Sequence, residues 1–171
     1  MEALVAQILV TAFSVTAGAL LALAIERGTR SRTERSAEIN ALRLLCIEIA
    51  SRRALAPEQL RGPITIDRAD PDSDLNRVLR SIVLLRKEIR AARRALRPRS
   101  RAWSSLNGLV ASCNVFIESV EEHPAGIADE LAALRIEIDR QLVELCAVHP
   151  RDLVYRPAGS AAYSAAPAAR A

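Results

Sequence analysis

Three aspartates spaced two residues apart, Asp70, Asp72 and Asp74, are the strongest sign of metal chemistry in this chain. A calcium-binding EF-hand loop begins in this way, because carboxylates at its first, third and fifth positions coordinate the ion. The loop also needs a glycine at its sixth position and a glutamate at its twelfth, where this chain has leucine and serine. We therefore predict no metal site, and interpret these carboxylates and Ser73 as capping groups of a following helix.

Nucleophilic and acid–base chemistry lacks a recognisable motif: there is no GxSxG elbow, no P-loop and no HExxH pair. His123 and His149 each precede a proline at the end of a predicted helix, which is typical of a turn or a cap. The three cysteines lie on apolar helix faces, which favours reduced core residues over reactive thiols. We predict that the chain is not an enzyme and has no catalytic residues, cofactor or small-molecule substrate. The cysteines are Cys46, Cys113 and Cys146.

Charge is the second candidate for function, because basic and acidic residues are separated along the chain. Residues 86–101 contain eight Lys and Arg against one Glu, a net charge of +7, whereas residues 118–144 contain two Arg against eight Asp and Glu, a net charge of −6. The basic segment could bind anionic lipid headgroups, an acidic partner or nucleic acid, or it could pair with the acidic segment. Nucleic acid ranks last, because no aromatic platform or DNA-binding motif accompanies the charge. The candidate contact residues are Arg86, Arg90, Arg93, Arg94, Arg97, Arg99 and Arg101.

Residues 3–25 form an uncharged run of 23 residues. As a helix it would rise about 34 Å, enough to cross a hydrocarbon core of about 30 Å. Four arginines follow within about a dozen residues, which predicts a cytoplasmic C-terminal side and an external N-terminus. A cleavable signal peptide and a soluble core helix are the alternatives, but a signal peptide has basic residues before its apolar run and a soluble helix of this length usually carries charge. We predict a single-pass protein of the plasma (inner) membrane.

The small and polar residues of this run share one helical face, because they follow one another at steps of three or four. Small residues let membrane helices approach closely, and a buried glutamine amide needs a partner that a symmetry-related helix could supply. The pattern predicts a homo-oligomer or pairing with another membrane protein. The same face could instead line a polar pathway through an oligomer. It consists of Gln7, Thr11, Ser14, Gly18 and Ala22.

The composition of the whole chain favours helices, since half of its residues are apolar, only 3% are aromatic and glycine is scarce. Apolar residues recur at helical spacing before Pro57 and in three later segments, about 74–97, 100–121 and 127–148. The first of these three keeps a heptad alternation typical of coiled-coil packing. Its predicted core positions are Leu75, Val78, Ile82, Leu85, Ile89, Ala92 and Leu96.

The sequence thus predicts an all-α fold, with one N-terminal transmembrane helix followed by a cytoplasmic antiparallel (up-down) bundle of about four helices. If the second helix returns towards the membrane, its basic C-terminal end lies near the headgroups and residues 118–122 lie far from them. The predicted divisions are 3–25 transmembrane, 26–56 juxtamembrane and first cytoplasmic helix, 57–73 Pro-rich connector, 74–149 three bundle helices and 150–171 disordered Ala-rich tail.

The function predicted from these features is that of a membrane-anchored interaction or scaffold protein that self-associates through its transmembrane helix. One alternative is a membrane-active oligomeric effector that forms a polar pathway. Another is a regulator that binds nucleic acid or another polyanion through residues 86–101.

Overall fold

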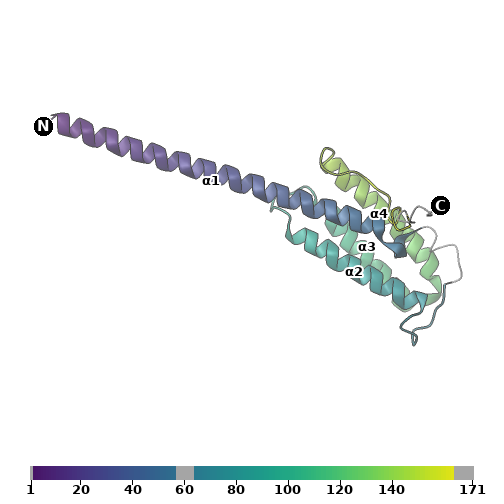
Figure 1. Ribbon diagram of the computed structural model, residues 1–171. Coiled ribbons are helices and arrows are strands. Elements are labelled where there is room, and N and C mark those ends of the chain that lie inside the picture. Colours follow the sequence, from purple (N-terminus) through teal and green to yellow (C-terminus); the bar gives the residue numbers. More distant parts are fainter. Residues whose placement is uncertain (1, 57–63, 164–171) are drawn as a thin grey trace, which may run out of the picture. The chain divides into compact units, whose positions relative to one another are not determined.

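The computed structural model describes residues 2–56 and 64–163, and it describes side chains from residue 22 onward. Within these residues the chain is all-helical and contains no strand, which confirms the all-α part of the predicted fold class (Figure 1). The elements are α1 (Glu2–Ser51), η1 (Arg53–Leu55), α2 (Asp74–Arg94), α3 (Trp103–Glu122), η3 (Pro124–Gly126) and α4 (Ile127–Val148), where η marks a short 3₁₀ helix.

The chain divides into two compact units, Met1–Ala37 and Glu38–Ala171. In the first unit, every residue from 22 to 37 is exposed and helical. Among the residues whose side chains are described, no helix has the length and apolar character needed to cross a membrane. Most of the predicted transmembrane segment, residues 3–21, lies outside those described side chains, so the membrane span stays a prediction.

The second unit is a bundle in which neighbouring helices run antiparallel. Pairs of contacts between residues far apart in sequence fix the directions of α1, α2 and α3, and the short turn η3 reverses the chain between α3 and α4. The contacts are Arg97–Glu38 and Arg52–Ser81 for α1 and α2, and Arg86–Asn114 and Arg93–Asn107 for α2 and α3.

The bundle core confirms the periodicity read from the sequence. All seven predicted core positions of residues 74–97 are buried, although α2 itself ends at Arg94. On α3, Leu109 and Phe116 widen the predicted apolar face. Each fully buried aliphatic or aromatic side chain contributes about 1.5–3 kcal/mol, so this interlocked set supplies the main drive for folding. Helix α2 begins as predicted, with the Ser73 hydroxyl accepting a hydrogen bond from the Asn76 amide.

Hydrogen bonds also join Thr65 of the connector to the first residues of α2. The Asp74 carboxylate accepts hydrogen bonds from the Thr65 amide (3.1 Å) and the Thr65 hydroxyl (2.6 Å), and the Leu75 amide donates to the Thr65 carbonyl. These hydrogen bonds lower the pKa of Asp74. Ile64 packs against the core. Residues 57–63 of the predicted connector lie outside the described residues.

The prediction of a disordered tail from residue 150 is wrong for residues 150–163. Leu153 and Ala158 are buried in the core of the bundle. The Arg43 guanidinium donates to the Asp152 carbonyl (3.2 Å), and the Ala158 amide donates to the Asp139 carboxylate (2.7 Å). The segment therefore lies along both α1 and α4.

The same segment supplies the C-terminal cap of α1. The amides of Gly159 and Ala161 donate to the carbonyls of Ile49 (3.1 Å) and Ala50 (2.8 Å). The last carbonyls of a helix have no partner within it, so these bonds satisfy groups that would otherwise need water. Gly159 has φ +72°, and a Cβ there would lie 2.4 Å from backbone atoms of Leu55. Only glycine fits at this close approach.

Candidate functional site

The predicted oligomerisation face falls mainly outside the described side chains. Gln7, Thr11, Ser14 and Gly18 belong to residues 2–21, whose side chains the structure does not describe, whereas Ala22 is exposed on α1. This face therefore stays a prediction that rests on the spacing of its residues.

The seven predicted contact arginines divide into two groups. Three of them hold neighbouring helices together and are only partly exposed. Such hydrogen bonds between a charged donor and a neighbouring helix position the helices, and they occupy part of each guanidinium group. The bonds are Arg86 to Asn114 (2.8 Å), Arg93 to Asn107 (3.1 Å) and Arg97 to Glu38 (2.5 Å).

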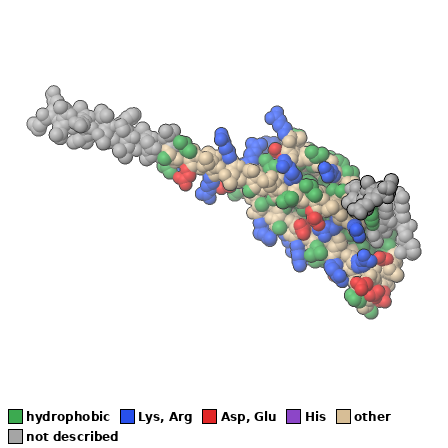
Figure 2. Space-filling view, viewed as in Figure 1, with side chains coloured by type: hydrophobic (Ala, Val, Ile, Leu, Met, Phe, Trp, Pro, Cys, Tyr) green, Lys and Arg blue, Asp and Glu red, His purple; other side chains and the backbone are tan. Residues whose placement is uncertain are grey.

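The other four arginines, together with Lys87, make up what we call the exposed basic cluster. They lie on the last turns of α2 and on the loop to α3, and all are exposed. Within the described part of the chain, no hydrogen bond or ion pair joins them to an acidic residue. Figure 2 shows more Lys and Arg than Asp and Glu side chains on the visible face of the molecule. The cluster consists of Lys87, Arg90, Arg94, Arg99 and Arg101.

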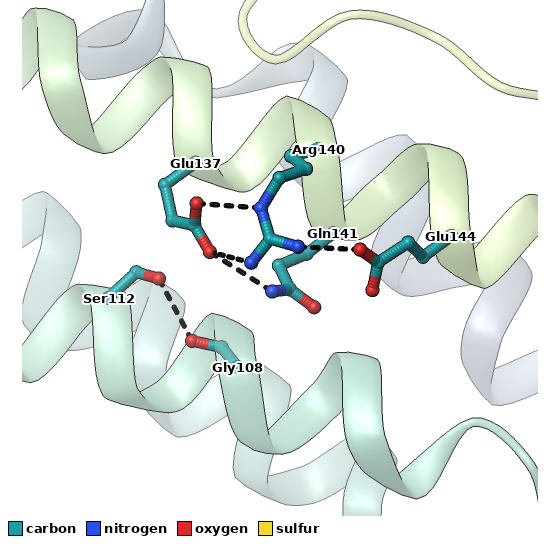
Figure 3. Close-up of polar contacts among 6 residues, drawn as sticks. All are labelled: Gly108, Ser112, Glu137, Arg140, Gln141 and Glu144. Atoms are coloured by element: carbon teal, nitrogen blue, oxygen red, sulfur yellow. Dashed lines mark hydrogen bonds and ion pairs between the residues drawn. The ribbon is translucent and has the colours of Figure 1, made fainter.

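Acidic residues of α4 are engaged elsewhere. Glu137 and Glu144 pair with Arg140 of their own helix at 2.5 and 2.6 Å (Figure 3). Hydrogen bonds from Arg140 and Gln141 hold the pKa of Glu137 at about 2. Asp139 accepts the Ala158 amide. Within residues 22–56 and 64–163, therefore, no ion pair joins the basic segment to the acidic segment.

The ion pair between Glu38 and Arg97 locates the basic cluster in the bundle. Glu38 is the first residue of the second unit, and its side chain is completely buried, while that of Arg97 is 35% exposed. The pair thus places the C-terminal end of α2 beside the point where the chain enters the bundle, which we call the Glu38 end. The Trp103 indole donates to the Arg97 carbonyl (3.1 Å), and the Arg93 guanidinium lies 6.0 Å from the Trp103 ring centre.

A second polar cluster joins α3 to α4 and has a packing role. Gln141 is buried, and its amide donates to Glu137 (3.0 Å). A Cβ at Gly108 would lie 2.5 Å from the Gln141 side chain, so glycine permits this approach of the two helices. Figure 3 shows Gln141 directed at the turn of α3 that carries Gly108, whose carbonyl accepts the Ser112 hydroxyl (2.9 Å). Sequence reasoning missed this cluster, although a lone glycine within an apolar helix was a usable signal.

Thiol chemistry and metal binding find little support in the described geometry. Burial raises the pKa of Cys46 to about 12 and that of Cys113 to about 11, so both stay protonated at neutral pH. The aspartates before α2 act in turns and caps, since Asp70 accepts the amide of Asp72 (2.9 Å). Within the described residues, no three or more His, Cys, Asp or Glu side chains form a group that could hold a metal ion.

No protein-family model, curated protein or solved structure matches the chain. The candidate site is therefore defined by its own geometry. It consists of the exposed basic cluster and the Glu38–Arg97 pair that fixes it at one end of the bundle.

Proposed function

We propose that this chain is a non-enzymatic, membrane-anchored interaction module of the inner membrane. It self-associates through its predicted transmembrane segment, residues 3–25, and its bundle rests on the cytoplasmic surface with the exposed basic cluster against anionic lipid headgroups. The observation that carries the proposal is the Glu38–Arg97 ion pair, because it fixes the basic end of α2 beside the point where the chain enters the bundle, twelve residues (26–37) after the predicted membrane segment.

A short helical linker separates the predicted membrane segment from the bundle. It comprises residues 26–37, which rise about 18 Å along α1. Each basic residue close to an anionic surface contributes about 1 kcal/mol, so the unpaired cations of the cluster together hold the bundle at the surface.

The test uses the full chain in lipid nanodiscs, with and without phosphatidylserine. We expect hydrogen exchange of backbone amides around residues 95–102 to slow in the anionic discs, and high salt to reverse the effect. The triple variant Arg94→Gln, Arg99→Gln and Arg101→Gln should lose the difference between the two lipids. The matched control Arg151→Gln and Arg156→Gln, which changes exposed arginines outside the cluster, should keep it.

Two results would overturn this proposal. One is equal exchange in neutral and anionic discs, which would show that headgroups do not contact the cluster. The other is release of the chain into the aqueous fraction when cell membranes are washed with carbonate, which would remove the anchor. Slowed exchange on adding single-stranded DNA to neutral discs, without any lipid effect, would instead favour a polyanion-binding regulator.

A further inference from the structure

The uncharged face of α1 continues far beyond Ala22. From there the spacing of three, four and four residues repeats without interruption to the last residue of the helix. This is an 11-residue repeat of about 3.67 residues per turn, close to the period of the α-helix, so the residues stay on one face. All of these residues are exposed. We call them the α1 stripe: Ala22, Ile25, Thr29, Thr33, Ser36, Asn40, Leu44, Ile47 and Ser51.

The stripe has the composition of a helix-packing surface. None of its positions is charged, although nine charged residues occupy the other positions of residues 22–51. Its large apolar side chains are solvent-exposed, Ile25 by 59%, Leu44 by 67% and Ile47 by 47%. The hydroxyls of Thr29 and Thr33 donate to carbonyls of α1 itself, so packing against the stripe would leave these two donors satisfied.

Within the second unit the opposite face of α1 is already in use. Leu42, Leu45 and Ile49 lie buried in the bundle core. Leu44 and Ile47 border a groove of about 470 Å³ between α1 and α2, which is also lined by small alanines and by Glu48 and Glu88. The stripe therefore remains available to a helix from another molecule.

We propose that the α1 stripe is the interface with a second copy of this chain, packed in parallel along α1. This inference rests on the proposed self-association, because membrane anchors in one bilayer orient both copies alike. Arg43 and Glu48 flank the stripe on opposite sides, five residues apart, which is the spacing at which flanking charges of two parallel helices meet. Within one copy Arg43 also donates to the Asp152 carbonyl and Glu48 pairs with Arg52, so the contact across the interface adds to these bonds or replaces them. A two-fold interface brings both such pairs together, so the chain is complementary to itself.

Single-cysteine crosslinking of the full chain in its native membranes tests the interface. The background variant carries Cys46→Ala, Cys113→Ala and Cys146→Ala, and its thermal unfolding is first checked against the natural chain. We expect copper phenanthroline to crosslink Thr33→Cys, Asn40→Cys and Ile47→Cys into dimers at least several-fold faster than the control variants. The controls are Glu34→Cys, an exposed neighbour off the stripe, and Lys87→Cys on α2. Equal rates at stripe and control positions would overturn the interface.

The same experiment separates this inference from the proposed function. Crosslinking at Ser14→Cys but not at Asn40→Cys or Ile47→Cys would retain self-association in the membrane and overturn the interface along the bundle. Crosslinking at Asn40→Cys and Ile47→Cys in a chain that carbonate releases would support the interface and overturn the anchor.

A charge placed in the stripe provides an independent measurement. Ile47→Glu should shift the chain from dimer to monomer in detergent by analytical ultracentrifugation, with unchanged circular dichroism. Val154→Glu, at an apolar residue that is more solvent-exposed (75%, against 47% for Ile47) and lies off α1, should remain dimeric. A folded Ile47→Glu variant that stays dimeric would contradict the proposal.

Discussion

Helix α1 is held at the two ends of the bundle by different kinds of interaction. At the Glu38 end, one buried carboxylate pairs with Arg97, which lies 59 positions along the chain. At the other end, the backbone amides of Gly159 and Ala161 bind the last carbonyls of α1. The interaction at the Glu38 end depends on the identity of two side chains, and the interaction at the C-terminal end of α1 depends on a backbone conformation that glycine permits. A charge change should therefore disturb the first end, and a change in backbone freedom should disturb the second.

The largest expected loss of stability comes from removing the Glu38–Arg97 ion pair. Arg97→Ala leaves a fully buried carboxylate without its countercharge, and such a loss costs about 3 kcal/mol of unfolding free energy. Urea unfolding followed by circular dichroism measures it. Arg99→Ala removes an exposed arginine two residues away and should change stability by no more than about 0.5 kcal/mol. A similar loss in both variants would show that the ion pair is not the cause.

Disrupting the C-terminal cap of α1 should lower the free energy of unfolding by a somewhat smaller amount. Gly159→Ala forces a side chain into a left-handed conformation with its Cβ against backbone atoms of Leu55, so we expect a loss of about 2 kcal/mol. The same unfolding assay applies. Gly28→Ala is the matched control, because a Cβ there meets no atom within 4 Å and alanine favours a helix. Unchanged stability of Gly159→Ala would refute the cap described here.

A milder change tests what holds residues 150–163, which we call the capping segment, against the bundle. Asp139→Ala removes the acceptor of the Ala158 amide, and the loss of one such hydrogen bond costs about 1 kcal/mol. Asp139→Asn keeps an acceptor oxygen and should recover most of the stability. If Asn is as damaging as Ala in denaturant titrations, the negative charge rather than the hydrogen bond holds the segment.

The smallest effect concerns a surface ion pair that serves as a reference for the buried one. Arg140 keeps the pKa of Glu137 at about 2, below the ordinary value of 4.5, so the pair stabilises the fold above about pH 4.5 and ceases to do so as pH falls towards 2. Because Glu137 is 37% exposed, the contribution is only about 0.5 kcal/mol. The difference in unfolding free energy between the natural chain and Glu137→Gln should shrink over this pH range. A difference that grows with acidification would contradict this sign.

Periodicity made the bundle predictable. The core positions of α2 could be read from the sequence because each apolar side chain recurs every three or four residues and faces the same neighbours. The capping segment has no such periodicity. Its attachment depends on amide hydrogens and on one glycine with positive φ, which composition does not reveal.

The candidate site was predictable only in outline. Charge counting located the basic stretch, but it treated Arg86, Arg93 and Arg97 as equivalent to their exposed neighbours. Their partners lie on other helices, so only the folded structure separates them. Glu38 was not among the predicted site residues, although it lies four residues before Leu42 on the apolar face, which was a signal for its burial.

The course of the capping segment decides where a label can be attached without touching the basic surface. The Tyr163 ring lies 6.0 Å from the guanidinium of Arg53, just beyond the C-terminus of α1. A fluorophore or affinity handle attached after this tyrosine would be joined to the chain at the end of the bundle opposite to Glu38. Such a handle would leave the proposed headgroup contact undisturbed, whereas an insertion between α2 and α3 would interrupt it.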